Sequence, residues 1–107
     1  MNEMTPPLPD PEAERITRAL GVTRARVEVL RLVLERGELT AADLMAELGI
    51  SRSGLQRHLT TLTADGLLSE RHTTHPRGSG PVIYWAADRA EIERALRSFS
   101  EHILGTP

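Results

Sequence analysis

The stretch TAADLMAELGISRSGLQRHLTTLTADGLL, residues 40–68, decides the fold of this chain. Thr40 and Asp43 have the spacing of a capping box, in which each side chain accepts a hydrogen bond from the other residue's backbone N–H, and this predicts the start of a short helix. Gly49 predicts the end of that helix, because many helices end in a left-handed backbone conformation that glycine adopts at little steric cost. Ser51 is a strong N-cap for a second helix. Two helices joined by a tight turn containing glycine predict a helix-turn-helix.

The second helix, expected over residues 51–65, has one apolar and one polar side. Leu55, Leu59 and Leu62 recur at i, i+4 and i+7 and predict a buried stripe. His58 lies one step from this stripe, so we expect a partly buried structural histidine. The polar side carries residue types that contact base edges in a major groove, namely Arg52, Ser53, Gln56, Arg57, Thr60 and Thr61. Any amphipathic helix has a polar outer side, so the helix alone does not decide between DNA recognition and a solvated face.

A β-hairpin is expected after the helix-turn-helix. Asp65-Gly66 predicts a turn, residues 82–87 (VIYWAA) are β-branched and aromatic, and the segment HPRGSGP between the two predicted strands is dense in turn formers. Such a hairpin suits a wing, here residues 71–81, that lies along the phosphate backbone or in the minor groove. Its expected contacts are Arg71, Arg77 and Ser79. Arginines in loops are also common for solubility alone, and the preceding helix-turn-helix is what favours the DNA-binding interpretation.

Three further helices are expected. One runs from Asp10-Pro11 to about Leu20, and one from Thr23 to about Arg36 with an apolar face of Val27, Leu30, Val33 and Leu34. The last begins at Asp88, where Glu91 repeats the capping-box spacing. One core of this size is too small to bury both terminal helices, so we expect them to form a dimer interface. Its residues would be Ile16, Ala19, Leu20, Ile92, Leu96, Phe99 and Ile103.

Composition limits the classes of protein. The 107 residues fit one domain at 10–105, after a proline-rich segment at 1–9 that we expect to be a disordered arm. There is no cysteine, which excludes disulfides and thiolate metal sites. No stretch has the length and apolarity of a membrane span or a signal peptide, so the expected location is the cytoplasm, without a membrane partner. The net charge of −2 counts somewhat against DNA binding, but residues 51–80 carry four Arg against Asp65 and Glu70, a balance of +2.

The order of these elements resembles the ArsR-type winged-helix repressors of bacteria over roughly residues 23–104. The most specific part is LTAADLMAELGISRSGLQRHLTTLTADGLLSER, in which His58-Leu59 and Asp65-Gly66-Leu67 match that family's pattern closely. The resemblance implies a homodimer that binds a palindromic operator in double-stranded DNA with its two recognition helices. Members that sense metals have cysteines in the helix before the recognition helix, where this chain has Ala41, Ala42 and Met45.

These observations predict a mainly α protein with a small β-hairpin, a winged helix-turn-helix that acts as a sequence-specific transcriptional regulator, most simply a repressor. The alternative is a winged-helix module that binds proteins and not DNA. No catalytic constellation is visible, so an enzyme is not expected. We expect no cofactor and no metal site, because Asp88 and His102 are too far apart to converge within one helix and His72 with His75 is a weak pair. An unidentified small-molecule effector would bind between the terminal helices and the wing base, where Trp85 and Phe99 are candidate walls or simply core.

Overall fold

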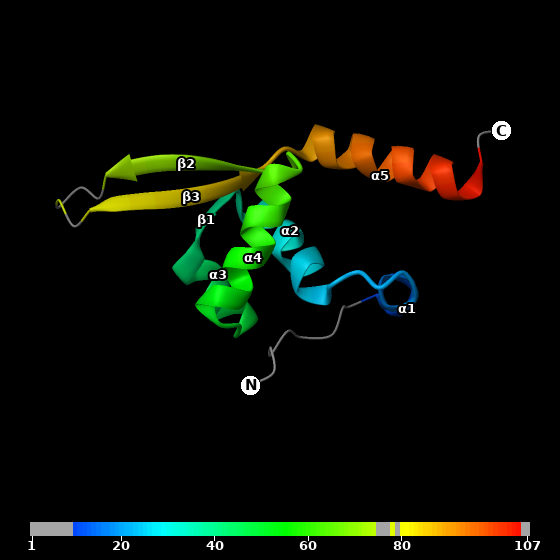
Figure 1. Cartoon of the computed structure of the whole chain (residues 1–107), viewed down its shortest axis with the longest axis horizontal. Coiled ribbons are helices and arrows are strands. Elements are labelled where there is room, and N and C mark those ends of the chain that lie inside the picture. The colour runs from blue at the N-terminus through cyan, green and yellow to red at the C-terminus, as the bar shows by residue number, and fades with distance from the viewer. Residues whose placement is uncertain (1–9, 75–77, 79, 106–107) are drawn as a thin grey trace.

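The computed structural model describes residues 10–74, 78 and 80–105, and over these residues the chain forms five helices and one three-stranded antiparallel sheet. In chain order the elements are α1 (Pro11–Ala19), α2 (Arg24–Arg36), β1 (Glu38–Thr40), α3 (Ala41–Leu48), α4 (Arg52–Ala64), β2 (Leu68–Thr74), β3 (Pro81–Ala87) and α5 (Arg89–Leu104). Figure 1 shows α2, α3 and α4 grouped at the centre. The predicted fold class, mainly α with a β-hairpin, is confirmed. The predicted arm at residues 1–9 lies outside the described residues.

The core lies where α2, α3, α4 and the base of the sheet meet. It is built almost entirely from leucine and valine, as the low aromatic content predicts, with Trp85 as its one aromatic residue among those described. The predicted stripe of Leu55, Leu59 and Leu62 is buried in it. Burial of a leucine or valine side chain stabilises a fold by about 1.5–3 kcal/mol, so this cluster is the main source of stability.

The strand β1 was not predicted. It covers only Glu38, Leu39 and Thr40, which is too short to show an alternating pattern, and it pairs antiparallel with β3. The sheet order is therefore β1-β3-β2, with Leu39 opposite Trp85. Leu39 and Trp85 are both buried, so the strand joins the base of the hairpin to the helical core.

The predicted buried face of α2 is partly wrong. The residues that enter the core are Ala25, Val29, Leu32 and Val33. Val27, Leu30 and Leu34 are half-buried and line a groove under α5. The helix has apolar residues on two sides, and its sequence alone does not say which side faces the core.

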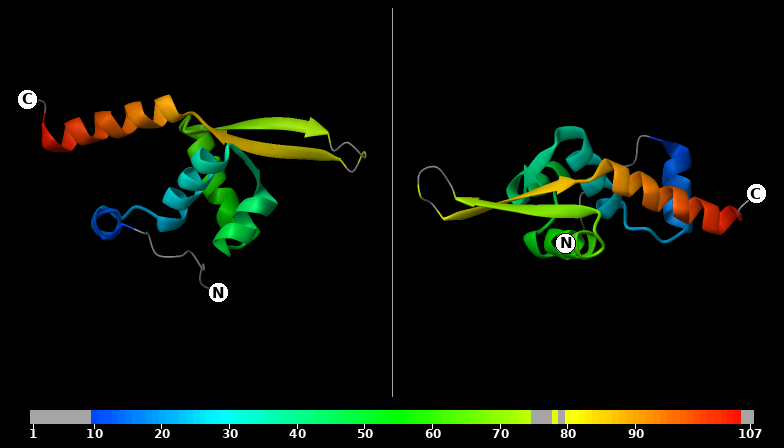
Figure 2. Two further views of the ribbon diagram at one scale, coloured as in Figure 1. Left: turned by 180° about the vertical axis from the view of Figure 1, so that it is seen from behind. Right: turned by 90° about the horizontal axis from the view of Figure 1, so that it is seen from above.

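The remaining elements project from this centre. The hairpin of β2 and β3 extends to one side and α5 to the opposite side, with α1 near the same end as α5 (Figures 1 and 2). No described helix is long and apolar enough to cross a membrane.

Candidate nucleic-acid interface

The helix-turn-helix forms through the local interactions that its sequence predicts. Thr40 N–H donates to Asp43 Oδ2 at 3.0 Å and Asp43 N–H donates to Thr40 Oγ1 at 3.1 Å, which completes the capping box of α3. Gly49 ends α3 in the left-handed region with φ 66°. Gly54 N–H then donates to Ser51 Oγ at 3.1 Å and caps α4. These bonds satisfy backbone groups that would otherwise be without partners, and they define where α3 begins and ends and where α4 begins.

The exposed side of α4 borders a hollow of about 500 Å³. Its lining residues on α4 are Ser53, Gln56, Arg57, Thr60 and Thr61. Five of the six residues predicted to face DNA thus lie together, although Thr61 is half-buried. The sixth, Arg52, lies instead beside a second hollow between the helix-turn-helix and β3, which Gln56 also borders. Arg52 and Gln56 are therefore the members of the set that lie on the side of the wing.

Arg26 on α2 also lines the first hollow, and the sequence did not point to it. Arg26 Nε donates to Nδ1 of His58 at 3.3 Å. His58 is buried, as expected for a structural histidine, and through this bond it ties α4 to α2. Nothing in the sequence distinguishes Arg26 from the other arginines of α2, because its place beside α4 depends on how the two helices pack.

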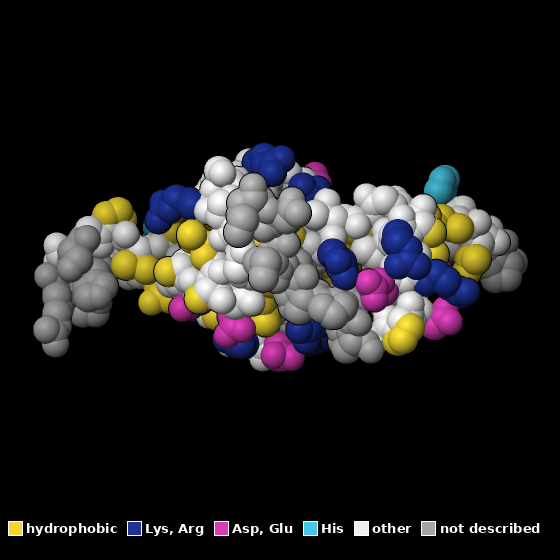
Figure 3. Space-filling view, turned by 90° about the horizontal axis from the view of Figure 1, so that it is seen from below, with side chains coloured by type: hydrophobic (Ala, Val, Ile, Leu, Met, Phe, Trp, Pro, Cys, Tyr) yellow, Lys and Arg dark blue, Asp and Glu magenta, His cyan; other side chains and the backbone are white. Residues whose placement is uncertain are grey.

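The arginines on this side carry charge that no described carboxylate neutralises, as do Arg18, Arg89 and Arg97 elsewhere among the described residues. Among the described residues, Arg26, Arg52 and Arg57 have no carboxylate partner within salt-bridge distance. Six other described arginines have one: Arg15, Arg24, Arg31, Arg36, Arg71 and Arg94. Seen from below, the arginine side chains are spread over the face and do not form one continuous basic patch (Figure 3). The positive charge near α4 is thus small in amount but not neutralised.

The wing is the hairpin of β2 and β3, and its base is held by an ion pair. Arg71 donates from Nε and Nη2 to the two carboxylate oxygens of Glu38 at 2.8 and 2.9 Å, and its guanidinium lies 4.7 Å from the centroid of the Tyr84 ring. These hydrogen bonds, and then the charge of Arg71, hold the pKa of the Glu38 carboxyl below its usual range. Arg71 was expected to contact DNA. In this structure its guanidinium is already occupied, and its contact with DNA stays a prediction. Arg77 and Ser79 lie outside the described residues.

Comparisons with known proteins agree with this geometry. The model of the MarR family matches residues 20–78, which is more than half of the chain. The chain belongs to the MarR family. No curated protein sequence matches it. The MarR family is distinct from the ArsR-type repressors that the motif resembles, and the ArsR-type assignment itself is not shown. What is shown is a DNA-binding winged-helix transcriptional regulator.

Solved structures show the same fold at low sequence identity. The structure of a possible transcriptional regulator from Methanosarcina mazei superposes with a TM-score of 0.61 at 20% identity, over 86% of this chain and 82% of that one. Reduced HlyU from Vibrio cholerae gives 0.56 at 23% identity, over 90% of each chain. The reduced form of MarR from E. coli gives 0.55 at 19% identity, over 86% of this chain and 64% of that one.

The terminal helices of this MarR-family chain leave apolar side chains in solvent. Ile16, Leu20, Leu96, Phe99 and Ile103 are all exposed, and Ala19 is too. Ile92 differs, because it is only 7% exposed and packs beside α2 and Leu67 within its own chain. Its assignment to a dimer interface is therefore corrected: it has almost no surface left for a second copy.

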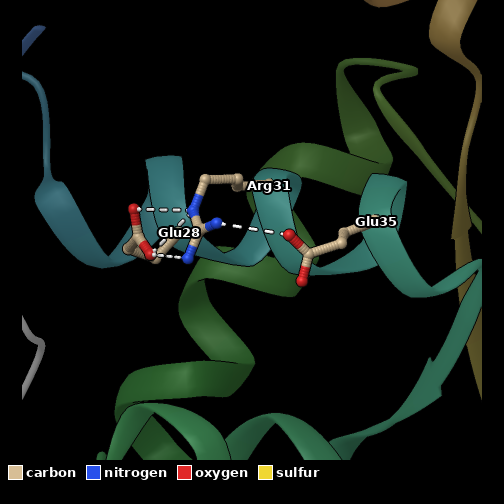
Figure 4. A network of polar contacts seen from close by, with 3 residues as sticks. All are labelled: Glu28, Arg31 and Glu35. Carbon is tan, nitrogen blue, oxygen red and sulfur yellow. Dashed lines mark hydrogen bonds and ion pairs between the residues drawn. The ribbon is translucent and has the colours of Figure 1, made fainter. Parts of the chain in front are cut away.

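An apolar groove of about 420 Å³ separates α2 from α5. Val27, Leu30 and Leu34 form one wall, and Ala95, Leu96 and Phe99 form the other. Phe99 lines this groove, whereas Trp85 is core and does not border it. None of the described residues that line the groove comes from α1, so an effector site between the two terminal helices stays a prediction. Arg31 stands at the edge of the groove and donates to the buried carboxylate of Glu28 at 3.0 Å and to Glu35 at 3.5 Å (Figure 4).

Two of the residues weighed as metal ligands contact other groups: Asp88 at the start of α5, and His72, whose Nε2 lies 2.7 Å from Glu70 Oε1. Asp88 caps α5 by accepting from Glu91 N–H at 3.1 Å, and Glu91 pairs with Arg94. Within residues 10–74, 78 and 80–105 no three His, Cys, Asp or Glu side chains converge on a common point. His75 lies outside the described residues.

Proposed function

We propose that this MarR-family regulator acts as a homodimeric repressor that blocks a promoter by binding a palindromic operator. In each copy, α4 would lie in the major groove and contact bases through Arg52, Ser53, Gln56 and Arg57, with Thr60 and Thr61 on the same face. The wing would follow the backbone or the minor groove through Arg71, Arg77 and Ser79. The two copies of α4 would enter successive major grooves about 34–36 Å apart.

The observation that supports this proposal most is the exposed side of α4. It combines hydroxyls, an amide and arginines that no described carboxylate neutralises. Phosphates and base edges offer the acceptors that such donors would gain on binding.

Selection of bound duplexes from a random DNA pool tests the proposal. We expect an enriched palindrome whose half-sites have centres about one helical turn apart, and affinity that falls steeply as salt rises. The same selection with Arg57→Ala should lose a defined base preference within each half-site. Enrichment of no sequence, together with binding that does not depend on salt, would favour the protein-interaction module instead.

The groove between α2 and α5 is where we expect a small-molecule effector, if the repressor has one. Its walls are apolar, and Arg31 at its edge is already paired with Glu28 and Glu35, so an apolar molecule would suit it. Because α2 packs on α4 and α5 carries the proposed dimer contacts, a ligand there would affect both the DNA-contacting helix and the spacing of the two copies.

A further inference from the structure

The hollow beside α4 has one wall that does not belong to the helix-turn-helix. Arg26 comes from α2, yet it lines the same hollow as Gln56, Arg57 and Thr60. A side chain on this wall lies beside the face of α4 that is proposed to enter the major groove, and not on that face. In a protein–DNA complex, that position is occupied by the sugar-phosphate backbone at the edge of the groove, and contacts to it fix the register of the protein.

The charge of this hollow favours an anion. Arg26 and Arg57 both border it, and neither pairs with a described carboxylate. The nearest acidic residue along α2 is Glu28, whose carboxylate is buried and bound to Arg31. Hydroxyl groups of Ser53, Thr60 and Thr61 add further donors around the same space. Two guanidinium groups with hydroxyls are a donor set that suits a phosphate.

Arg26 is also held in place before any ligand arrives. Its Nε donates to His58 Nδ1 at 3.3 Å, and His58 is buried on the inner side of α4. The bond uses one of the five N–H groups of the guanidinium and leaves four for an acceptor in the hollow. A side chain that is already oriented loses less conformational entropy on binding than a freely rotating one.

From these observations we infer that Arg26 contacts a backbone phosphate of DNA from α2, beside the major-groove contacts of α4. The inference rests on the proposed function, because it requires α4 to face DNA. It adds a contact outside the helix-turn-helix and the wing. The contact carries no sequence information and fixes the depth and register of α4.

Arg26→Gln is the decisive variant, because glutamine loses the charge while its amide can still donate to His58. Binding is measured across salt from about 50 to 200 mM, on the selected operator and on an unrelated duplex of the same length. We expect Arg26→Gln to weaken both duplexes on the order of tenfold and to reduce the slope of log affinity against log salt by about one. Arg26→Lys should keep the slope. Arg97→Gln is the matched control, since Arg97 lies on α5 and has no described carboxylate partner, and it should change neither affinity nor slope.

The possible results separate this inference from the proposed function. If the unmodified protein binds DNA with a salt-dependent affinity and Arg26→Gln leaves the slope unchanged, Arg26 makes no phosphate contact and the proposed function still stands. If Arg26→Gln weakens the operator alone, Arg26 contacts a base and the inference is wrong. If the unmodified protein binds neither duplex in a salt-dependent way, both fail together. Thermal unfolding of each variant checks that α2 still packs on α4.

Discussion

Gln56 and Arg57 are neighbours on α4 but have different surroundings in the unbound protein. Gln56 Nε2 donates to Thr60 Oγ1 at 3.2 Å, so its amide is oriented, whereas Arg57 has no described carboxylate partner. If each contacts one base pair, Gln56→Ala and Arg57→Ala should each cost about 1–3 kcal/mol of binding and relax specificity at one position. Operators with single base-pair changes measure this at matched salt. An Arg57→Ala variant that binds its operator unchanged would mean that α4 does not contact bases.

Glu28 is the buried carboxylate of the core, with a side chain that is 2% exposed. Arg31, 46% exposed, neutralises it through hydrogen bonds from Nε and Nη2 and also reaches Glu35 (Figure 4). Removing Arg31 would leave a buried charge without its partner, so Arg31→Ala should destabilise the fold by about 1–3 kcal/mol in urea unfolding. Glu35→Ala removes only an exposed partner and should stay within about 0.5 kcal/mol. Equal losses for the two variants would contradict this account.

The wing is an element whose orientation depends on a bond outside its own hairpin. Glu38 on β1 and Arg71 on β2 are joined across β3, which lies between them in the sheet. Because Arg71 lowers the pKa of Glu38, the stabilisation is complete above the usual glutamate pKa of about 4.3 and is lost as the pH falls through the lower folded value. Glu38→Gln should therefore reduce hydrogen-exchange protection of the β2 amides at neutral pH. The difference from the unmodified protein should shrink as the pH falls towards about 3.

The control for this prediction is Glu93→Gln, the same change on an α5 residue with no described ion pair. It should leave β2 protection unchanged at every pH. If Glu38→Gln lowered protection equally at neutral and acid pH, the loss would come from side-chain packing and not from the ion pair. If Arg71 contacts a DNA phosphate, Glu38→Gln should also strengthen DNA binding, because the variant releases the Arg71 guanidinium from its ion pair.

Elements governed by local interactions could be predicted from the sequence. The capping box at Thr40, the left-handed Gly49 and the leucine spacing on α4 each depend on residues within one or two turns. By contrast, β1 exists because β3 pairs with it, and the buried face of α2 depends on which neighbours pack against it. For the same reason five residues around the hollow of α4 were predicted, whereas Arg26 was not: the sequence specifies a helix face, but not what a different helix places beside it.

At the scale of the whole molecule, the large apolar side chains that are exposed among the described residues gather at one end. The arginines without carboxylate partners near α4 lie on the central group of helices, while apolar side chains are exposed at the end formed by α1 and α5, where Figure 3 shows them interspersed with charged side chains. The net charge of −2 therefore does not describe the surface that would face DNA. A second copy that covered the apolar end would leave both α4 helices free, and this arrangement connects dimer formation to operator binding.

Leu96→Glu with Phe99→Glu tests that arrangement. The two side chains are 62% and 49% exposed in the single chain, so placing carboxylates there should leave the fold intact while it opposes any apolar contact with a second copy. We expect the unmodified protein to sediment as a dimer at micromolar concentration and the double variant as a monomer with unchanged helicity. The monomer should lose most of its affinity for the full palindrome and little of its affinity for one half-site, because only the link between the two copies is removed. Arg97→Glu on the same helix should remain a dimer. A double variant that still dimerises, or an unmodified protein that is monomeric, would show that the terminal helices do not join two copies.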